Sequence, residues 1–210
     1  MKIIERLEPS KHVQGRFLAW FEGEKDPVRV TENEVAAFSL YRGRALEQDE
    51  LERLLRAGSA SSARALGARM LGQRPLSRQE LVKRMTEKGV SEQDAEAAAD
   101  WLSDIGALNE LDYARSIVRH YDGRGYGEQK LRQELLRRGV AREHWEEALA
   151  ERGEAEDSVL RFLRTRLRGR TPDEKELKRV TDALLRRGFR WDEVKTGLAR
   201  YGMEIEEESI

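Results

Sequence analysis

Residues 131–140 read LRQELLRRGV, and a related pattern recurs as LVKRMTEKGV at residues 81–90 and as VTDALLRRGF at residues 180–189. In each copy, two apolar residues four positions apart lie on one face of a helix. The glycine four positions later can adopt the left-handed conformation that ends a helix, and basic residues just before it interact favourably with the helix C-terminus. The chain therefore contains three copies of one helical pattern, spaced by fifty and then forty-nine residues.

Two more amphipathic segments flank each copy. Helices before the copies are predicted near Ala63–Leu71, Leu111–Tyr121 and Glu156–Leu167, and helices after them at Glu92–Asp104, Arg142–Arg152 and Asp192–Arg200. A short three-helix unit buries little apolar surface alone, so neighbouring units are expected to stack. The pattern predicts three tandem three-helix repeats in an elongated, curved array.

The predicted helix starts carry recognisable caps. Ser77 and Glu80 form a capping-box pattern before the first copy. Thr171 and Glu174 predict the same pattern for the third copy, and the proline between them suits the first helical position. The second copy begins instead after a flexible loop, Gly123–Gly127, that contains three glycines.

The first 58 residues differ from the rest of the chain. Short strands are predicted at Lys2–Glu8, Gln14–Glu22 and Val28–Val30. Thr31 and Glu34 form a capping box that starts a helix, and a further helix over Asp49–Arg56 is predicted to stop at Gly58. This segment is expected to form a small β/α unit.

The whole chain is therefore predicted to be mainly α-helical and to have four parts. They are an N-terminal β/α unit at 1–58, a first repeat at 59–108, a second repeat at 109–155, and a third repeat with an acidic tail at 156–210. With 39% apolar and 38% charged residues, the sequence suits thin helical layers, in which many residues face water, better than one thick core.

The composition also restricts where the protein works. The chain has no cysteine, which excludes disulfides and fits a reducing cytoplasm. Its first residues carry Glu5, Arg6 and Glu8 and do not resemble a signal peptide. No apolar run approaches the roughly 20 residues that cross a bilayer. We expect a soluble, cytoplasmic protein.

The charges alternate in blocks, although the net charge is only −1. Arg115–Gly139 has seven basic and three acidic residues, and Arg161–Arg190 has eleven basic and four acidic residues. Between these blocks, Glu87–Asp112 holds eight acids and Glu143–Asp157 holds seven. Such alternation predicts local faces of opposite sign, or solvated helix faces that pair with each other.

The residue types needed for catalysis are not brought together by any motif. His12, His120 and His144 have no spacing that places two of them on one metal, and no phosphate-binding P-loop sequence occurs. The glycines of Gly123–Gly127 follow a predicted helix rather than a strand, which argues against a dinucleotide turn. The acidic tail, Glu204–Glu208, is expected to be a solvated end. We therefore expect no enzyme activity, no metal and no cofactor.

A family resemblance is carried by three stretches: Ser77-x-x-Glu80-Leu81 with Gly89-Val90, then Ile105-Gly106-Ala107-Leu108-Asn109-Glu110-x-x-Tyr113-Ala114, and then the glycine-rich loop with Leu131-x-x-Glu134-Leu135-x-x-x-Gly139-Val140. In this order and spacing they resemble the RecX family. The similarity covers about residues 60–152, and the third repeat follows in register. Asn109-Glu110 departs from the paired acids that the family shows there. Asn109 is still expected to cap the next helix, and Glu110 keeps a negative charge near its start.

The resemblance implies a function. RecX-like proteins bind the RecA recombinase, especially its filament on single-stranded DNA, and inhibit its ATPase, strand-exchange and coprotease activities. A member would modulate DNA repair, homologous recombination and the SOS response. A row of helical repeats suits such a target, because several modest contacts on a repeated partner add through effective concentration.

The basic second and third repeats are the predicted partner-binding surface. The candidates are Arg124, Tyr126, Lys130, Arg132, Arg137, Arg138, Arg161, Arg164, Arg168, Arg170, Lys178 and Arg179. Arg161, Arg164 and Arg168 fall three and four positions apart and are expected to form one ridge on a helix that meets acidic recombinase surface or DNA phosphates. The alternative is that half of these arginines pair with the acidic stretch at 143–157.

Two other functions fit parts of the sequence. In the first, a repeat acts as a helix-turn-helix and the protein regulates by binding nucleic acid directly, although the near-zero net charge favours a protein partner. Weak direct DNA contact as a supplement to protein binding stays open. In the second, the chain is a scaffold unrelated to recombination, which leaves the family pattern unexplained.

Overall fold

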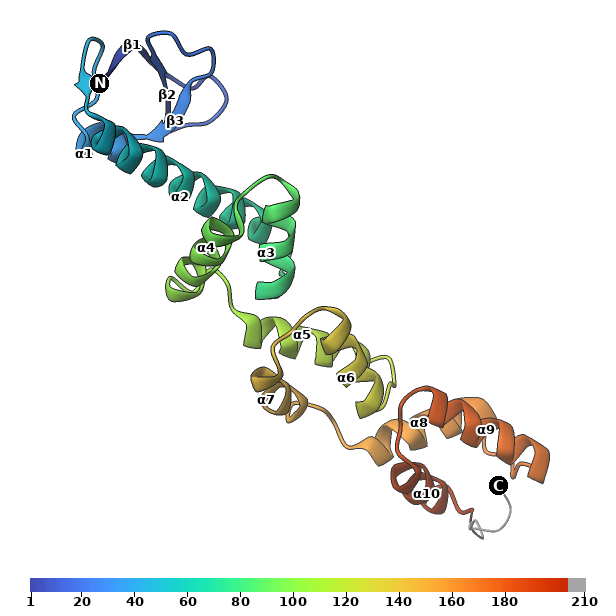
Figure 1. The fold of residues 1–210 in the computed structure, drawn as a ribbon. Coiled ribbons are helices and arrows are strands. Elements are labelled where there is room, and N and C mark those ends of the chain that lie inside the picture. The colour runs from blue at the N-terminus through green and yellow to red at the C-terminus, as the bar shows by residue number, and fades with distance from the viewer. Residues whose placement is uncertain (204–210) are drawn as a thin grey trace. The chain divides into compact units, whose positions relative to one another are not determined.

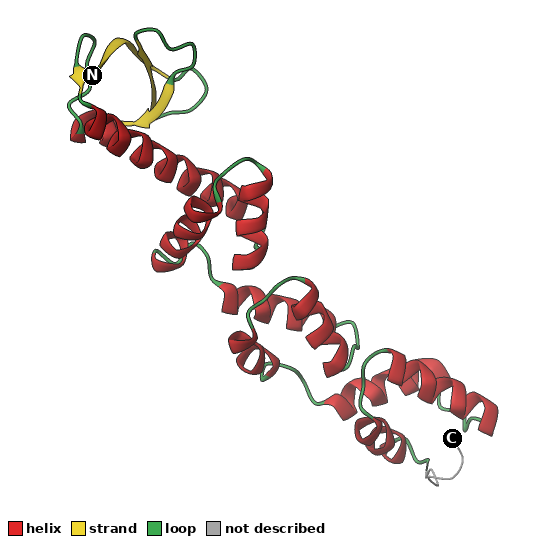
Figure 2. Cartoon of the chain, viewed as in Figure 1, coloured by secondary structure: helices red, strands yellow, loops and turns green. Residues whose placement is uncertain are grey.

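The computed structural model describes residues 1–203. Helices predominate, and strands occur only in the N-terminal part of the described chain (Figures 1 and 2). The chain forms two compact units. The first contains residues 1–75 and 80–108, and the second contains residues 76–79 and the described residues from 109 to 203. The predicted class, mainly α with a small strand-containing unit at the N-terminus, is confirmed.

A small antiparallel sheet opens the first unit. Its strands are β1 (Lys2–Pro9), β2 (Arg16–Phe21), β3 (Val28–Thr31) and β4 (Ala45–Leu46), in the order β3-β2-β1-β4. The three predicted strands are confirmed. The fourth was not predicted, because a strand of two residues has no alternation to recognise. Ile4, Phe21 and Val30 are buried in the core of this sheet.

The first helix, α1 (Glu32–Ala37), begins as predicted. The backbone N–H of Thr31 donates a hydrogen bond to the Glu34 carboxylate at 2.7 Å, which completes the capping box. The helix that follows is longer than predicted.

That longer helix, α2 (Gln48–Gln73), runs without interruption through Gly58, so the predicted stop at Gly58 is wrong. Gly58 is buried, and a Cβ atom placed there would lie 2.8 Å from the carbonyl oxygen of Arg29 in β3. The glycine therefore permits close packing between helix and sheet and does not end the helix. Because α2 continues, the separate helix predicted near Ala63–Leu71 is its second half.

Helices α3 (Arg78–Glu87) and α4 (Glu92–Asp104) follow α2. Helix α4 packs along α2, where a Cβ atom on Gly67 would lie 2.7 Å from Leu102. Met85 and Leu102 are completely buried. The small residue thus lets three helices share one thin core.

The second unit contains six further helices among its described residues. They are α5 (Glu110–Asp122), α6 (Glu128–Arg137), α7 (Trp145–Leu149) with a 3₁₀ turn at Arg142–His144 before it, α8 (Ala155–Leu167), α9 (Glu174–Arg186) and α10 (Trp191–Arg200). One core surrounds Leu131, Leu135 and Trp145, and another surrounds Leu163 and Leu184.

The three equivalent glycines end α3, α6 and α9 in the same way. Gly89, Gly139 and Gly188 have φ values of +86°, +67° and +87°. The backbone N–H of the next residue then donates to the carbonyl oxygen of the last buried apolar residue, at 3.1 Å for Val90, 3.1 Å for Val140 and 3.3 Å for Phe189. This is the hydrogen-bond pattern that closes a helix on a left-handed glycine, and it confirms the predicted repeat.

The predicted cap of the third copy is wrong by two residues. Asp173, rather than Thr171, caps α9, and its carboxylate accepts a hydrogen bond from the backbone N–H of Glu176 at 2.7 Å. A carboxylate is a stronger acceptor than a hydroxyl and lies favourably at a helix N-terminus, which explains the shift.

No helix within residues 1–203 combines the length and the apolar character that crossing a bilayer requires. The predicted acidic tail, Glu204–Glu208, lies outside the described residues.

Candidate functional site

The backbones of the second and third repeats are hydrogen-bonded to each other where α9 ends and α6 begins. The N–H of Gly127 donates to the carbonyl oxygen of Arg187 at 2.9 Å, and the N–H of Gln129 donates to the carbonyl oxygen of Gly188 at 3.1 Å. Donors at a helix start and acceptors at a helix end have no partners within their own helices. Here they satisfy each other across the two repeats.

Arg187 reinforces this junction with its side chain. The guanidinium lies 4.9 Å from the centre of the Phe162 ring and 5.5 Å from that of Tyr126. It also donates to the backbone carbonyl oxygens of Arg124 at 3.3 Å and Gly125 at 3.2 Å. One arginine of the third repeat therefore holds the glycine-rich loop of the second repeat through cation–π contacts and hydrogen bonds.

An ion-pair network crosses the same junction. Arg152, which follows α7, donates to Glu193 of α10 at 2.7 Å and to Glu128 of α6 at 3.3 Å. The Arg152 and Glu193 side chains are only 16% and 10% exposed. Glu193 also accepts from the backbone N–H of Arg190 at 2.7 Å. Charges so far removed from water need this pairing, so the two repeats are held in a defined geometry.

The predicted basic residues of α6 are mostly neutralised within the second repeat. Glu134 is buried and lies 3.1 Å from the Lys130 ammonium and 2.7 Å from the Arg137 guanidinium. Arg138 donates to the Tyr113 hydroxyl at 3.2 Å and lies 3.9 Å from Glu134.

These contacts have electrostatic consequences. Burial raises the pKa of the Glu134 carboxyl, but hydrogen bonds from Arg137, Lys130 and Tyr121 outweigh it and hold the pKa below its usual value. A hydrogen bond with Tyr113, opposed by burial, raises the pKa of the Arg138 guanidinium. Glu134, which the sequence analysis named only as part of the family motif, is therefore the central acceptor of these cations.

Arg132 is paired as well. Its guanidinium contacts Glu146 at 2.8 Å and Glu128 at 2.7 Å, and hydrogen bonds to these two carboxylates raise its pKa above the usual range. Glu146 belongs to the acidic stretch that sequence analysis offered as an internal partner. For Arg132, internal pairing is therefore the observed arrangement.

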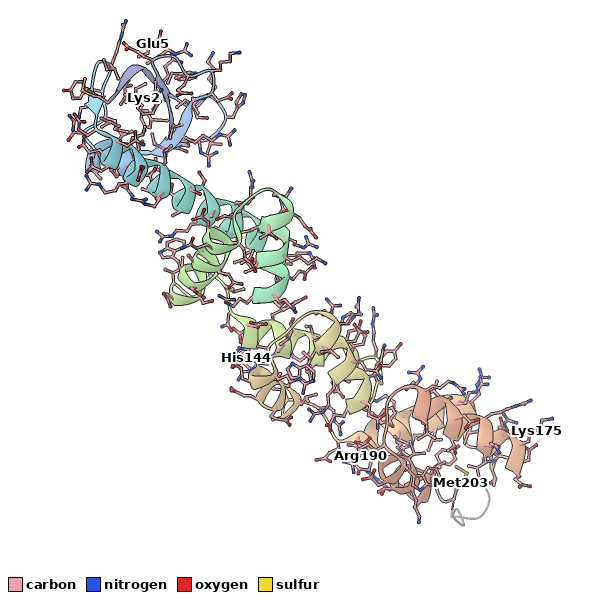
Figure 3. All side chains as sticks on the ribbon, in the orientation of Figure 1. Lys2, Glu5, His144, Lys175, Arg190 and Met203 are labelled. Atoms are coloured by element: carbon pink, nitrogen blue, oxygen red, sulfur yellow. The ribbon has the colours of Figure 1, made fainter. Side chains whose placement is uncertain are left out.

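The predicted cations of the third repeat have a different environment. Arg161 and Arg164 of α8 and Lys178 and Arg179 of α9 are exposed, and none has an ion-pair partner within residues 1–203. We call these four residues the third-repeat basic surface. Lys175, labelled in Figure 3, is likewise exposed near the start of α9.

Four further candidates are not counted in this surface. Helix α8 ends at Leu167, and Arg168 occupies its left-handed cap with φ of +51°, so the predicted three-residue ridge is wrong in its last member. Arg170 lies 3.5 Å from Glu176. Arg124 is exposed, and its backbone carbonyl oxygen accepts the hydrogen bond from Arg187 at the junction between the second and third repeats. Tyr126 is half-buried and packs edge-on against Tyr121, with ring centroids 5.7 Å apart.

Two exposed leucines were missed in the sequence. Leu136 is 61% exposed on α6, and Leu185 is 38% exposed on α9. They are equivalent positions, because each directly follows the second buried residue of its copy, and each precedes an arginine. Aligning the two copies would have revealed a repeated apolar residue facing solvent, which is typical of a contact surface when it is clustered with charge.

Comparison with known proteins identifies two of the repeats. Residues 63–102 match the family model described as RecX, first three-helix domain, and residues 109–149 match RecX, second three-helix domain. The regulatory protein RecX of Vibrio campbellii is 31% identical over 119 residues, which cover 56% of this chain and 77% of that protein. The chain belongs to the RecX family.

Other RecX proteins agree with this assignment. The regulatory protein RecX of Xanthomonas axonopodis pv. citri is 32% identical over 124 residues, which are 58% of this chain and 76% of that protein. A crystal structure of a regulatory protein RecX superposes with a TM-score of 0.73 at 20% identity, and the match covers 92% of this chain and 97% of that one. The relatives are named as regulators, and the fold is shared over most of the chain.

The departure from the RecX pattern at Asn109-Glu110 keeps its expected structural role. Asn109 caps α5, and its side-chain oxygen accepts from the backbone N–H of Asp112 at 3.0 Å. Glu110 accepts from the backbone N–H of Ala141 at 3.0 Å. The substituted carboxylate therefore connects the start of α5 to the segment after α6 in this RecX-family chain.

Proposed function

We propose that this RecX-family chain is a non-enzymatic regulator that binds the RecA recombinase and its filament on single-stranded DNA. It inhibits the ATPase, strand-exchange and coprotease activities of RecA and thereby modulates DNA repair and recombination in the cytoplasm. The proposal needs no cofactor, no membrane and no small-molecule substrate. The observation that carries it is the contrast between the paired cations of α6 and the third-repeat basic surface, whose four cations have no ion-pair partner within the described residues.

The internal junction supports this proposal. Because the second and third repeats are joined by backbone hydrogen bonds and the Arg152 network, cations and exposed leucines on both repeats are held at fixed spacing. A partner built from identical subunits can meet such repeated contacts together, so each contact need contribute only modestly. Exposed charges of this kind steer association and set register more than they add affinity.

The deciding experiment measures ATP hydrolysis by RecA from the same organism on single-stranded DNA while this protein is titrated. The test variant is Arg161→Glu with Arg164→Glu. The matched control is Lys11→Glu with Arg42→Glu, which reverses two exposed cations of the N-terminal unit that have no ion-pair partner among the described residues.

Wild type and control are expected to inhibit at substoichiometric amounts, whereas the test variant requires about tenfold more protein, the effect of roughly 1.4 kcal/mol. If the test variant inhibits as well as wild type does, the surface that binds RecA lies elsewhere on the molecule. No inhibition by folded wild-type protein would overturn the proposed function.

Direct regulation through nucleic acid is the second candidate function, because exposed arginines also suit phosphates. Salt dependence separates the two. If the protein inhibits by binding DNA alone, its affinity should fall steeply between about 50 and 200 mM salt, by an amount set roughly by the number of phosphate contacts. Binding to the protein component of the filament should weaken less.

A further inference from the structure

A basic pocket lies within the first unit, away from the third-repeat basic surface in the sequence. Its volume is about 570 Å³. Four cationic side chains line it, and they come from four separate segments: Arg16 of β2, Arg29 of β3, Arg69 of α2, and Lys88 after α3. The fold therefore gathers cations that are up to 72 positions apart in the chain.

These four cations are not paired with carboxylates in the described part of the chain. None of the four forms an ion pair within residues 1–203. The pocket contains one acid, Asp94, whose carboxylate already accepts hydrogen bonds from the hydroxyls of Ser59 at 2.6 Å and Ser91 at 2.8 Å. The excess of positive charge creates a local positive potential in a protein whose net charge is −1.

The chemistry of the lining indicates the ligand. Three of the four cations are arginines, whose planar guanidinium groups match phosphate oxygens in a bidentate geometry. No aromatic side chain is among the residues that line the pocket, so it offers no stacking platform for a base or a nucleoside. Ser62 adds a neutral hydroxyl donor at the same surface. Contacts of this kind recognise phosphates and carry no sequence information.

We propose that this pocket binds the phosphodiester backbone of nucleic acid, independently of base sequence. It is a second contact site, in a different unit from the third-repeat basic surface, and it does not depend on RecA being the partner. In a nucleoprotein complex it would add a salt-sensitive attachment to the strand, beside whatever the helical repeats bind.

The test measures binding of the full chain to a fluorescein-labelled oligothymidylate by fluorescence anisotropy, over a range of salt concentrations. The pocket variant is Arg29→Gln, Arg69→Gln and Lys88→Gln together, which leaves the half-buried Arg16 of β2 in place. The matched control is Lys11→Gln, Lys25→Gln and Arg42→Gln, which removes the same charge from exposed positions outside the pocket lining.

The pocket variant is expected to bind at least tenfold more weakly at low salt, and its slope of log affinity against log salt should fall by about 2, since each lost single-strand phosphate contact contributes about 0.7. The control should bind as wild type does. A thermal melt shows whether the pocket variant is folded, and relief of repulsion among like charges predicts that it is no less stable than wild type.

Two results would overturn the proposal. One is unchanged oligonucleotide binding by the pocket variant. The other is displacement of the oligonucleotide from wild type by a poly-glutamate peptide at lower concentration than by unlabelled oligonucleotide, which would assign the pocket to an acidic peptide. RecA inhibition by the same variants is a separate readout, so failure of this site and failure of the proposed function are distinguishable.

Discussion

Gly127, at the start of α6, lies in direct backbone contact with Gly188, at the end of α9. A Cβ atom on Gly127 would overlap the carbonyl oxygen of Gly188, and a Cβ atom on Gly188 would lie 2.5 Å from the backbone nitrogen of Lys130. The two glycines therefore allow the ends of two helices from different repeats to meet and exchange backbone hydrogen bonds.

Replacing Gly127 by alanine should separate the second and third repeats locally. The overlap with backbone atoms cannot be relieved by a side-chain rotation, so we expect a loss of about 2–3 kcal/mol from overpacking and weakened hydrogen bonds. Urea unfolding followed by circular dichroism measures the loss. The matched control is Gly72→Ala in α2, where no atom lies within 4 Å of the added Cβ and helix propensity predicts a gain of up to about 1 kcal/mol. Equal effects at both positions would contradict the role of the junction.

Replacing Glu134 by glutamine should destabilise the second repeat. The variant loses charge-assisted hydrogen bonds to Arg137 and Lys130, and we expect a cost of about 2 kcal/mol at pH 7. The folded-state pKa of Glu134 is below its ordinary value of 4.5, so its stabilising contribution is fully present above that value and is lost as pH falls through the folded pKa.

The difference in unfolding free energy between wild type and the Glu134→Gln variant should therefore stay nearly constant from pH 7 down to about 4.5 and shrink as the pH falls further, toward the lower folded-state pKa. Glu143→Gln is the control, because the Glu143 side chain is 78% exposed and its replacement should leave the stability nearly unchanged. A difference that stays constant down to low pH would exclude ionised Glu134 as the cause.

Thr181 offers a stabilising change. Its hydroxyl is completely buried in α9 and has no hydrogen-bond partner among the described residues. Valine has the same shape without the polar group, so Thr181→Val should raise the unfolding free energy by about 1 kcal/mol. At the exposed position 165 the Thr165 hydroxyl donates to the carbonyl oxygen of Arg161, and Thr165→Val should give no such gain. A loss of stability at position 181 would show that its hydroxyl has a partner.

Leu136 and Leu185 should contribute to inhibition of RecA rather than to folding. Both side chains are exposed, so replacing both by serine is expected to change stability by less than about 0.5 kcal/mol. If they contact the filament, the double variant should need several-fold more protein for half-maximal inhibition of the ATPase. Leu55→Ser, at a position of α2 that is 44% exposed, is the control. If the double variant inhibits as well as wild type does, the two leucines are not part of the surface that contacts RecA.

Much of this fold follows from the sequence because its signals are local. The left-handed glycines at 89, 139 and 188, the capping box at Thr31, and the Asn109 cap depend on residues within one turn of the helix they end or begin. The four-residue spacing of apolar residues likewise predicted the helical repeats. The capping rule gave the wrong residue at the start of α9, because Thr171 and Asp173 are both able to cap a helix there and Asp173 does so.

The tertiary structure alone decided which charges are available for a partner and why a glycine occurs at position 58. Arg132 is paired with a carboxylate fourteen positions away and Arg152 with one forty-one positions away, whereas Arg161 keeps its charge exposed. Within α2, position 58 is a glycine because the backbone of β3 at Arg29 packs too closely there for a Cβ atom. Helical periodicity places a side chain on a face, but ion pairing and close packing depend on what the folded chain brings to that face.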